Sequence, residues 1–170
     1  MQIIFATSAG DVRRNALSDF TNVMRNGKIA MDLPEGVELV NARICSEDDD
    51  VMLVTNSGRA IRFRTTDVRV FKGRKSTGVR GIRLSGDDRV VSMSVIRHFV
   101  ATPEERAGYL KMRRALAGVA DEAENGDDEP AVEGAISQER FEEMQSAEDL
   151  ILTITSKGQG KLSSSHDYPV

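Results

Sequence analysis

The sequence predicts a mainly β fold, a propeller-like array of four-stranded antiparallel blades, and two observations support this prediction. First, four mostly aliphatic or β-branched residues followed by Thr-x-x-Gly occur three times, ending at Gly10, Gly58 and Gly158. Second, short strand-like runs separated by turn residues fill the interval between copies. Four strands repeated about every 40 to 50 residues are typical of propeller blades.

The spacing of the three copies predicts the domain organisation. Gly10 and Gly58 are 48 residues apart, whereas Gly58 and Gly158 are 100 apart, which leaves 52 residues beyond one period. We therefore expect about two and a half blades within a piece of a longer protein. The expected parts are a blade repeat over 1–48, a second over 49–97, an acidic helical insertion over 98–149 and the first half of a truncated blade over 150–170.

Each full repeat is predicted to contain four strands. In the second repeat the runs are 51–55, 59–64, 79–84 and 89–96, and the run 27–33 of the first repeat aligns with the third of them. Glycine closes the first hairpin of each repeat, where a tight turn favours positive φ. An aspartate follows each of these glycines by nine residues and is predicted to satisfy turn amides; the three are Asp19, Asp67 and Asp167.

The insertion has the sequence features of helices. Thr102 is suited to cap a helix that begins at Pro103 and carries Glu105 three residues after the cap. Apolar residues follow at helical spacing, and Ser137 is suited to cap a second helix. The expected helices are 103–120 and 137–147. Residues 121–130 between them are acidic without apolar anchors, and we expect them to be mobile.

Charge is segregated along the chain. The 170 residues include 23 basic and 27 acidic ones, for a net charge of −4, but 98–149 alone carries −9. Within 56–83, nine basic residues stand against one acidic residue, Asp67. A basic body with an acidic insertion is predicted, and the basic body suits a polyanion as partner.

The candidate binding residues are the basic residues of the two repeats. Alternation along 59–64 places Arg62 and Arg64 opposite Ile61 and Phe63, so both guanidinium groups are expected to point to solvent. Aromatic residues are sparse here, which favours contact with the backbone of duplex DNA over stacking on single strands. Exposed strands also carry arginine and lysine for solubility, which is the alternative. The expected DNA-binding residues are Arg13, Arg14, Arg59, Arg62, Arg64, Arg69, Lys72, Arg74, Lys75, Arg80 and Arg83.

Catalytic and metal-binding patterns are weak. Ser165, His166 and Asp167 are consecutive, so on a strand their side chains alternate and cannot form a triad. Cys45 lies at no metal-ligand spacing from either histidine. We expect no catalytic residue, metal or cofactor in this chain, and we expect the acidic run 47–50 to be a solvated turn.

Sequence features also predict the cellular compartment. No apolar run approaches the roughly 20 residues that cross a bilayer, and the first residues lack a secretory signal pattern. The single cysteine permits no internal disulfide. We expect a cytoplasmic protein with no membrane partner.

Several stretches together resemble the C-terminal domain of the A subunit of bacterial DNA gyrase. Residues 77–84 are the most specific of them, and the resemblance covers about 118 residues, all but the insertion. The insertion resembles acidic helical insertions of some proteobacterial gyrases. The stretches are 5–14, 51–63, 76–84, 88–92 and 158–161.

This resemblance implies a six-bladed β-pinwheel whose basic rim wraps duplex DNA. In that family, wrapping supports ATP-dependent negative supercoiling by a type IIA topoisomerase of the bacterial cytoplasm and nucleoid. DNA cleavage and the use of ATP and Mg²⁺ belong to other parts of the enzyme. The implied partners are double-stranded DNA, a second A subunit, and the gyrase B subunit.

Two departures from the family pattern limit what the resemblance implies. The box Gln-Arg-Arg-Gly-Gly-Lys-Gly is absent, and residues 71–78 form a degenerate counterpart, so DNA binding without support of supercoiling is expected. Leu162 stands where the other repeats place Arg14 or Arg62. Two alternatives stay open: the C-terminal domain of the topoisomerase IV A subunit, and a propeller-like scaffold for a protein partner whose acidic insertion docks elsewhere or masks the basic rim.

Overall fold

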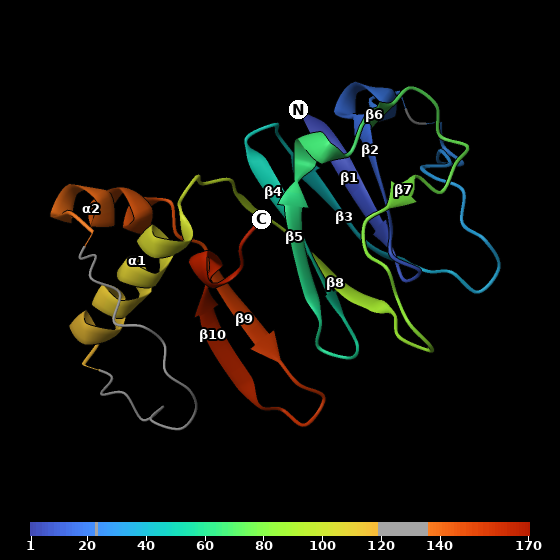
Figure 1. The fold of residues 1–170 in the computed structure, drawn as a ribbon. Coiled ribbons are helices and arrows are strands. Elements are labelled where there is room, and N and C mark those ends of the chain that lie inside the picture. The colour runs from blue at the N-terminus through green and yellow to red at the C-terminus, as the bar shows by residue number, and fades with distance from the viewer. Residues whose placement is uncertain (23, 119–135) are drawn as a thin grey trace. The chain divides into compact units, whose positions relative to one another are not determined.

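The computed structural model describes residues 1–22, 24–118 and 136–170 and divides into two compact units (Figure 1). The first unit spans residues 1–98 and consists of strands and short 3-10 turns, whereas the second spans 99–169 and joins two helices to a β-hairpin. The acidic run 121–130, which we expected to be mobile, lies outside the described residues.

Two sheets form the first unit. The first sheet has the order β3-β1-β2-β6, with β7 also paired to β2, and the second has the order β5-β4-β8. The strands of the first sheet are β1 (Gln2–Thr7), β2 (Asp11–Ala16), β3 (Leu39–Cys45), β6 (Val70–Phe71) and β7 (Val79–Arg80). Those of the second are β4 (Asp49–Thr55), β5 (Ala60–Arg64) and β8 (Val90–Arg97).

The first sheet contains strands of both repeats, which the repeat pattern does not predict. β7 pairs antiparallel with β2, with Val79 opposite Val12, and β6 pairs in parallel with the same strand. The predicted strand 79–84 is therefore reduced to two residues, and the run 27–33 forms no strand. Gly78 allows the close approach, because a Cβ there would lie 2.1 Å from the carbonyl oxygen of Val12.

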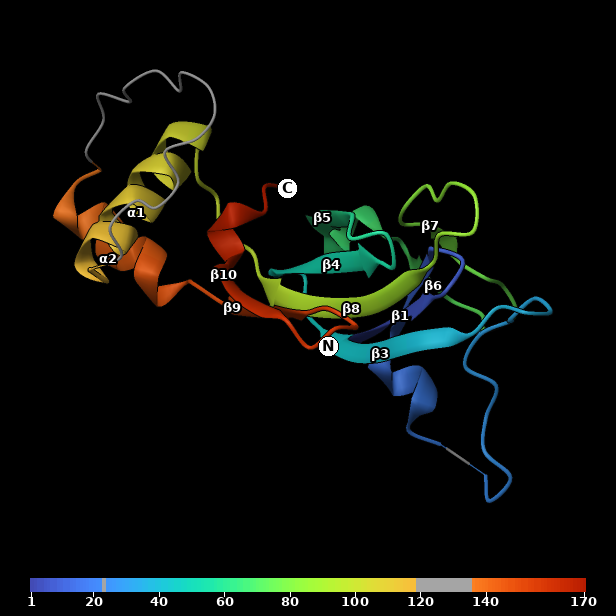
Figure 2. The same cartoon turned by 90° about the horizontal axis from the view of Figure 1, so that it is seen from below.

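The hydrophobic core of the first unit draws on both sheets. Ile4 and Val12 come from the first sheet, Val51 and Leu53 from the second, and all four are fully buried. At the seam, β3 runs beside β8 (Figure 2), and the side-chain amide of Asn41 donates to the carbonyl oxygen of Met93 at 3.2 Å. Burial of this apolar surface is the main force that holds the two repeats together.

Equivalent turns of the three repeats have the same geometry, as predicted. The threonine of each copy accepts a hydrogen bond from the backbone N–H four residues later at 3.2–3.3 Å, and the closing glycine has φ between +80° and +88°. Asp67 and Asp167 each accept a bond from the backbone N–H three residues earlier, both at 3.1 Å, which confirms their predicted role. Asp19 instead accepts from the side-chain amide of Asn15 at 3.3 Å.

The second unit packs the insertion helices against the turn that follows its β-hairpin. Tyr109, Phe141 and Met144 form the core, and the carbonyl oxygen of Met144 lies 2.9 Å from His166 Nε2. Ser165–Asp167 form a 3-10 turn and not the expected strand, and in this turn His166 Nε2 faces a backbone group while Asp167 accepts a hydrogen bond from Ser164 N. The elements are α1 (Pro103–Leu116), α2 (Gln138–Ser146), β9 (Leu150–Ile154) and β10 (Gly160–Ser164).

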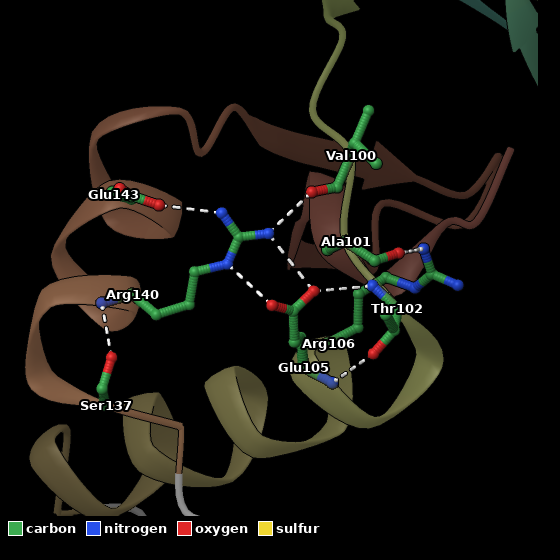
Figure 3. A network of polar contacts seen from close by, with 8 residues as sticks. All are labelled: Val100, Ala101, Thr102, Glu105, Arg106, Ser137, Arg140 and Glu143. Atoms are coloured by element: carbon green, nitrogen blue, oxygen red, sulfur yellow. Dashed lines mark hydrogen bonds and ion pairs between the residues drawn. The ribbon is translucent and has the colours of Figure 1, made fainter.

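Polar contacts join the two helices at their N-terminal ends (Figure 3). The predicted cap is confirmed, because Thr102 and Glu105 form a capping box at the start of α1. Arg140 of α2 donates to Glu105 and Glu143 at 2.9 and 2.8 Å and to the carbonyl oxygen of Val100 at 2.8 Å. The Arg140 hydrogen bond lowers the pKa of Glu105, which keeps this carboxylate ionised and fixes the helix pair.

Burial of Tyr109 makes the second unit sensitive to alkali. Burial, as the larger cause, and the negative charge of the nearby Glu148 carboxylate together raise the pKa of Tyr109 to about 12. The folded state then holds the phenolic proton more tightly than the unfolded chain, so this contribution to stability is complete below about pH 10 and is lost between about pH 10 and 12. We expect tyrosinate absorbance and helical circular dichroism to change together in this window in a Tyr168→Phe background. Titration of Tyr109 near pH 10 with intact helices would contradict this.

Candidate nucleic-acid interface

A basic cleft lies at the end of the first unit between the loop that joins β6 to β7 and the long connection that precedes β3. Figure 1 shows the course of these two segments. The volume of the cleft is about 700 Å³, and none of its lining residues is acidic. Both repeats contribute to it, and Arg74 of the second repeat donates to the carbonyl oxygen of Ile29 in the first at 2.9 Å. The lining residues are Arg13, Lys28, Ile29, Phe71, Lys72, Gly73, Arg74, Lys75 and Ser76.

Two guanidinium groups lie over the ring of Phe71, which lines this cleft. The Cζ atom of Arg69 lies 4.1 Å from the centre of the Phe71 ring, and that of Arg13 lies 5.0 Å from it. Burial is the largest cause that lowers the pKa of Arg13, and the positive charges of Arg69 and Arg74 lower this pKa further. Like charges held this close favour a bound anion, because an anion relieves their mutual repulsion.

Most of the expected DNA-binding residues are accessible. Arg74 is half-buried, and the exposed ones are Arg59, Arg64, Arg69, Lys72, Lys75, Arg80 and Arg83. Arg59 is already engaged, since it lies 3.4 Å from Asp88 and donates to the carbonyl oxygen of Arg83 at 3.0 Å. A hydrogen bond from the Ser57 hydroxyl lowers the pKa of Asp88 to about 2, so Asp88 stays ionised and offsets part of the Arg59 charge.

Three expected DNA-binding residues are buried. Arg13 is fully buried and Arg14 is 4% exposed, and Arg62 is 8% exposed because it pairs with Asp50 across the sheet at 2.8 Å. The expectation that Arg62 points to solvent is therefore wrong, and Ile61 on the other face is the more exposed of the two, at 37%. Asp50 is itself fully buried in β4, so the run 47–50 is not a solvated turn throughout.

Lys28 is the cleft residue that sequence reasoning missed. It is exposed, its Nζ donates to the carbonyl oxygen of Asp19 in its own repeat at 2.7 Å, and it lines the cleft together with the loop of the second repeat. Residues 24–38 form no helix or strand, so no periodicity indicates which loop they approach. The structure alone brings Lys28 into the site.

The described residues offer neither a metal-binding cluster nor a membrane-spanning helix. No group of histidine, cysteine, aspartate and glutamate side chains there is arranged to hold a metal ion. None of the described helices has the length and apolar character needed to cross a membrane.

Comparisons with known proteins agree with the repeat pattern and the fold. The DNA gyrase A subunit of Granulibacter bethesdensis is 47% identical over 182 residues, and that of Rickettsia bellii is 41% identical over 171. Each alignment covers all of this chain and 19% of the relative, so the chain spans about a fifth of the length of these relatives.

Solved structures share the fold. A DNA gyrase A C-terminal domain matches with a TM-score of 0.50 and 26% identity, covering 56% of this chain and 31% of that one. A topoisomerase IV C-terminal domain matches with a TM-score of 0.53 and 23% identity, covering 57% and 30%. The family model described as the DNA gyrase C-terminal domain, a β-propeller, matches residues 2–46, 49–97 and 149–170, which confirms the predicted fold class: the chain belongs to this family.

Proposed function

We propose that this chain binds duplex DNA and contributes to wrapping it, with the basic cleft as a principal contact. The observation that carries the proposal is the cleft itself, where Lys28, Lys72, Arg74 and Lys75 converge without an acidic lining residue. Each phosphate that such a cation neutralises releases counterions, which supplies affinity without sequence preference. Exposed basic residues outside the cleft, such as Arg64 and Arg80, extend the surface available to the DNA backbone.

Duplex is favoured over single-stranded DNA. Phe5 and Phe71 of the first unit are buried, and Phe20 and Phe63 are half-buried, so its described aromatic residues offer no open platform for unstacked bases. In the parent protein we propose that wrapping supports ATP-dependent negative supercoiling by a type IIA topoisomerase. The proposed protein partners are a second A subunit and the gyrase B subunit. The parts of the enzyme outside this chain would supply the chemistry that uses ATP and Mg²⁺. The enzyme would act on nucleoid DNA in the cytoplasm.

A salt series tests DNA binding directly. We expect the affinity of the chain for a labelled duplex, measured by fluorescence anisotropy, to fall steeply with salt. Combined Arg74→Ala and Lys75→Ala changes should flatten the slope of log K against log salt by about 1.8, since each lost phosphate contact removes about 0.9. Affinity at moderate salt should fall about tenfold or more.

The matched control removes the same two residue types from the second unit. Lys111→Ala with Arg114→Ala deletes equal charge from exposed positions of α1 and should leave the slope nearly unchanged. Equal effects of the two pairs would show that only net charge matters and would contradict a site at the cleft. No binding by the parent chain at low salt would favour the protein-scaffold alternative.

A further inference from the structure

Two fully buried side chains of β2 hold the cleft loop, residues 71–76, from beneath. The side-chain amide of Asn15 donates to the carbonyl oxygens of Phe71 and Gly73 at 2.8 and 3.2 Å. Arg13 donates to the Ser76 hydroxyl at 2.9 Å and, through Nε, to the Asn15 side-chain oxygen at 2.8 Å. The loop is thus anchored near its start, its middle and its end, and both anchors are 0% exposed.

The cleft loop depends on these anchors because little regular structure supports it. The strands that flank it, β6 and β7, hold two residues each, so the ladder hydrogen bonds that fix its ends are few. The loop also carries Lys72, Arg74 and Lys75, whose like charges repel one another. Hydrogen bonds from buried donors offset that repulsion and select one loop conformation.

The anchor pair is specific to the first repeat. Alignment on the repeat glycines places Ile61 and Phe63 of the second repeat, and Lys161 and Ser163 of the third, at the positions of Arg13 and Asn15. None of these four side chains supplies a guanidinium or an amide donor. The support of the cleft loop by β2 is therefore a special feature of the place where the first and second repeats meet, and not a general property of the repeat.

We propose that Arg13 and Asn15 are positioning residues that hold residues 71–76 so that the cations of the loop meet phosphate groups of duplex DNA. This inference rests on the proposed function of the cleft. Neither anchor touches DNA itself, because both are buried. Their role differs from that of the cations, since Asn15 is neutral and acts through hydrogen bonds to the loop backbone alone.

Asn15→Leu in the full chain tests the proposal without changing charge or side-chain size greatly. We expect the NMR order parameters of the backbone amides of residues 72–76, measured without DNA, to fall from the rigid range of about 0.85 to below about 0.6, while those of β1 stay rigid. We also expect duplex affinity to fall about tenfold and the salt slope to flatten by about 0.9 to 1.8, as for one or two lost phosphate contacts.

The control is Asn41→Leu, which removes another side-chain amide that donates to a backbone carbonyl, at 3.2 Å, on β3 away from the cleft. It should change neither the order parameters of residues 72–76 nor the salt slope. If Asn15→Leu does not fold, Asn15→Ser supplies the same readouts, because its hydroxyl is too short to reach both loop carbonyls.

Unchanged order parameters of residues 72–76 in a folded Asn15 variant would overturn the anchoring. Lower order parameters with unchanged duplex affinity and slope would overturn the link to DNA. Absence of salt-dependent binding by the parent chain would instead overturn the proposed function, and the order parameters would still show whether Asn15 anchors the loop, so the two failures are distinguishable.

Discussion

Arg62→Met is expected to lower the free energy of unfolding of the first unit by about 3 to 5 kcal/mol, because it leaves Asp50 as an uncompensated buried charge. Asp50 is fully buried, and one of its carboxylate oxygens accepts a hydrogen bond from Nε of Arg62 at 2.8 Å and forms an ion pair with Nη2 of Arg62 at 2.8 Å. Its other oxygen lies 2.9 Å from His98 Nδ1. Loss of the guanidinium removes the charge that makes this burial tolerable.

The same cluster joins three strands. Arg62 lies in β5, Asp50 in β4, and Arg62 also donates to the carbonyl oxygen of Arg97 at the end of β8, at 3.0 Å. Breaking this cluster should therefore destabilise all three strands of the second sheet. Urea unfolding measures the loss in the free energy of unfolding. Hydrogen exchange of the β4 amides assigns this loss to the first unit.

Two further variants separate the contribution of the pair from the cost of breaking it. Arg64→Met on the same strand removes an equal but exposed charge and should change stability by less than about 0.5 kcal/mol. The third repeat has Leu150 and Leu162 at the equivalent positions, so Asp50→Leu with Arg62→Leu should recover most of the loss, as replacement of buried ion pairs often does. A single Arg62→Met variant as stable as the parent would contradict the ion-pair interpretation.

The error over Arg62 shows what alternation cannot predict. A period of two separates the faces of β5 correctly, but it does not say that both faces of a strand are covered. The missing information was the partner of Arg62, which is Asp50, the residue just before the apolar run of the neighbouring strand. Gln2 occupies the equivalent position in the first repeat, where its side-chain oxygen accepts a hydrogen bond from Arg14 at 3.4 Å. A side-chain acceptor, Gln2 or Asp50, that lies diagonally across the hairpin from an arginine in two repeats is the signal that indicates a buried partner.

Local features were predicted best. The Thr-x-x-Gly turns, the aspartates after the second hairpin strands and the cap at Thr102 all depend on neighbouring residues, and each formed as expected apart from the different partner of Asp19. The anchors Arg13 and Asn15 depend on contacts across about 60 residues of sequence, which no local pattern encodes. The basic loop was predicted by composition, but the position of Lys28 in the same cleft was not.

Gly78→Ala is expected to destabilise the first unit by about 3 kcal/mol or more. Gly78 has φ +103°, which L-residues rarely adopt, and such backbone strain costs about 1 to 3 kcal/mol. The added Cβ would also lie 2.1 Å from the carbonyl oxygen of Val12, a backbone atom that cannot move without disturbing β2. Relief of the clash requires β7 to leave β2, which opens the seam between the two repeats.

Gly58→Ala provides the control because Gly58 has a similar φ, +85°, but open space around its Cβ position. It should cost only about 1 to 2 kcal/mol, the strain of a left-handed residue alone. Urea unfolding compares the two variants, and exchange of the Val79 amide reports whether β7 has separated. Equal losses would mean that backbone strain explains both, and that the close contact between Gly78 and Val12 does not hold the repeats together.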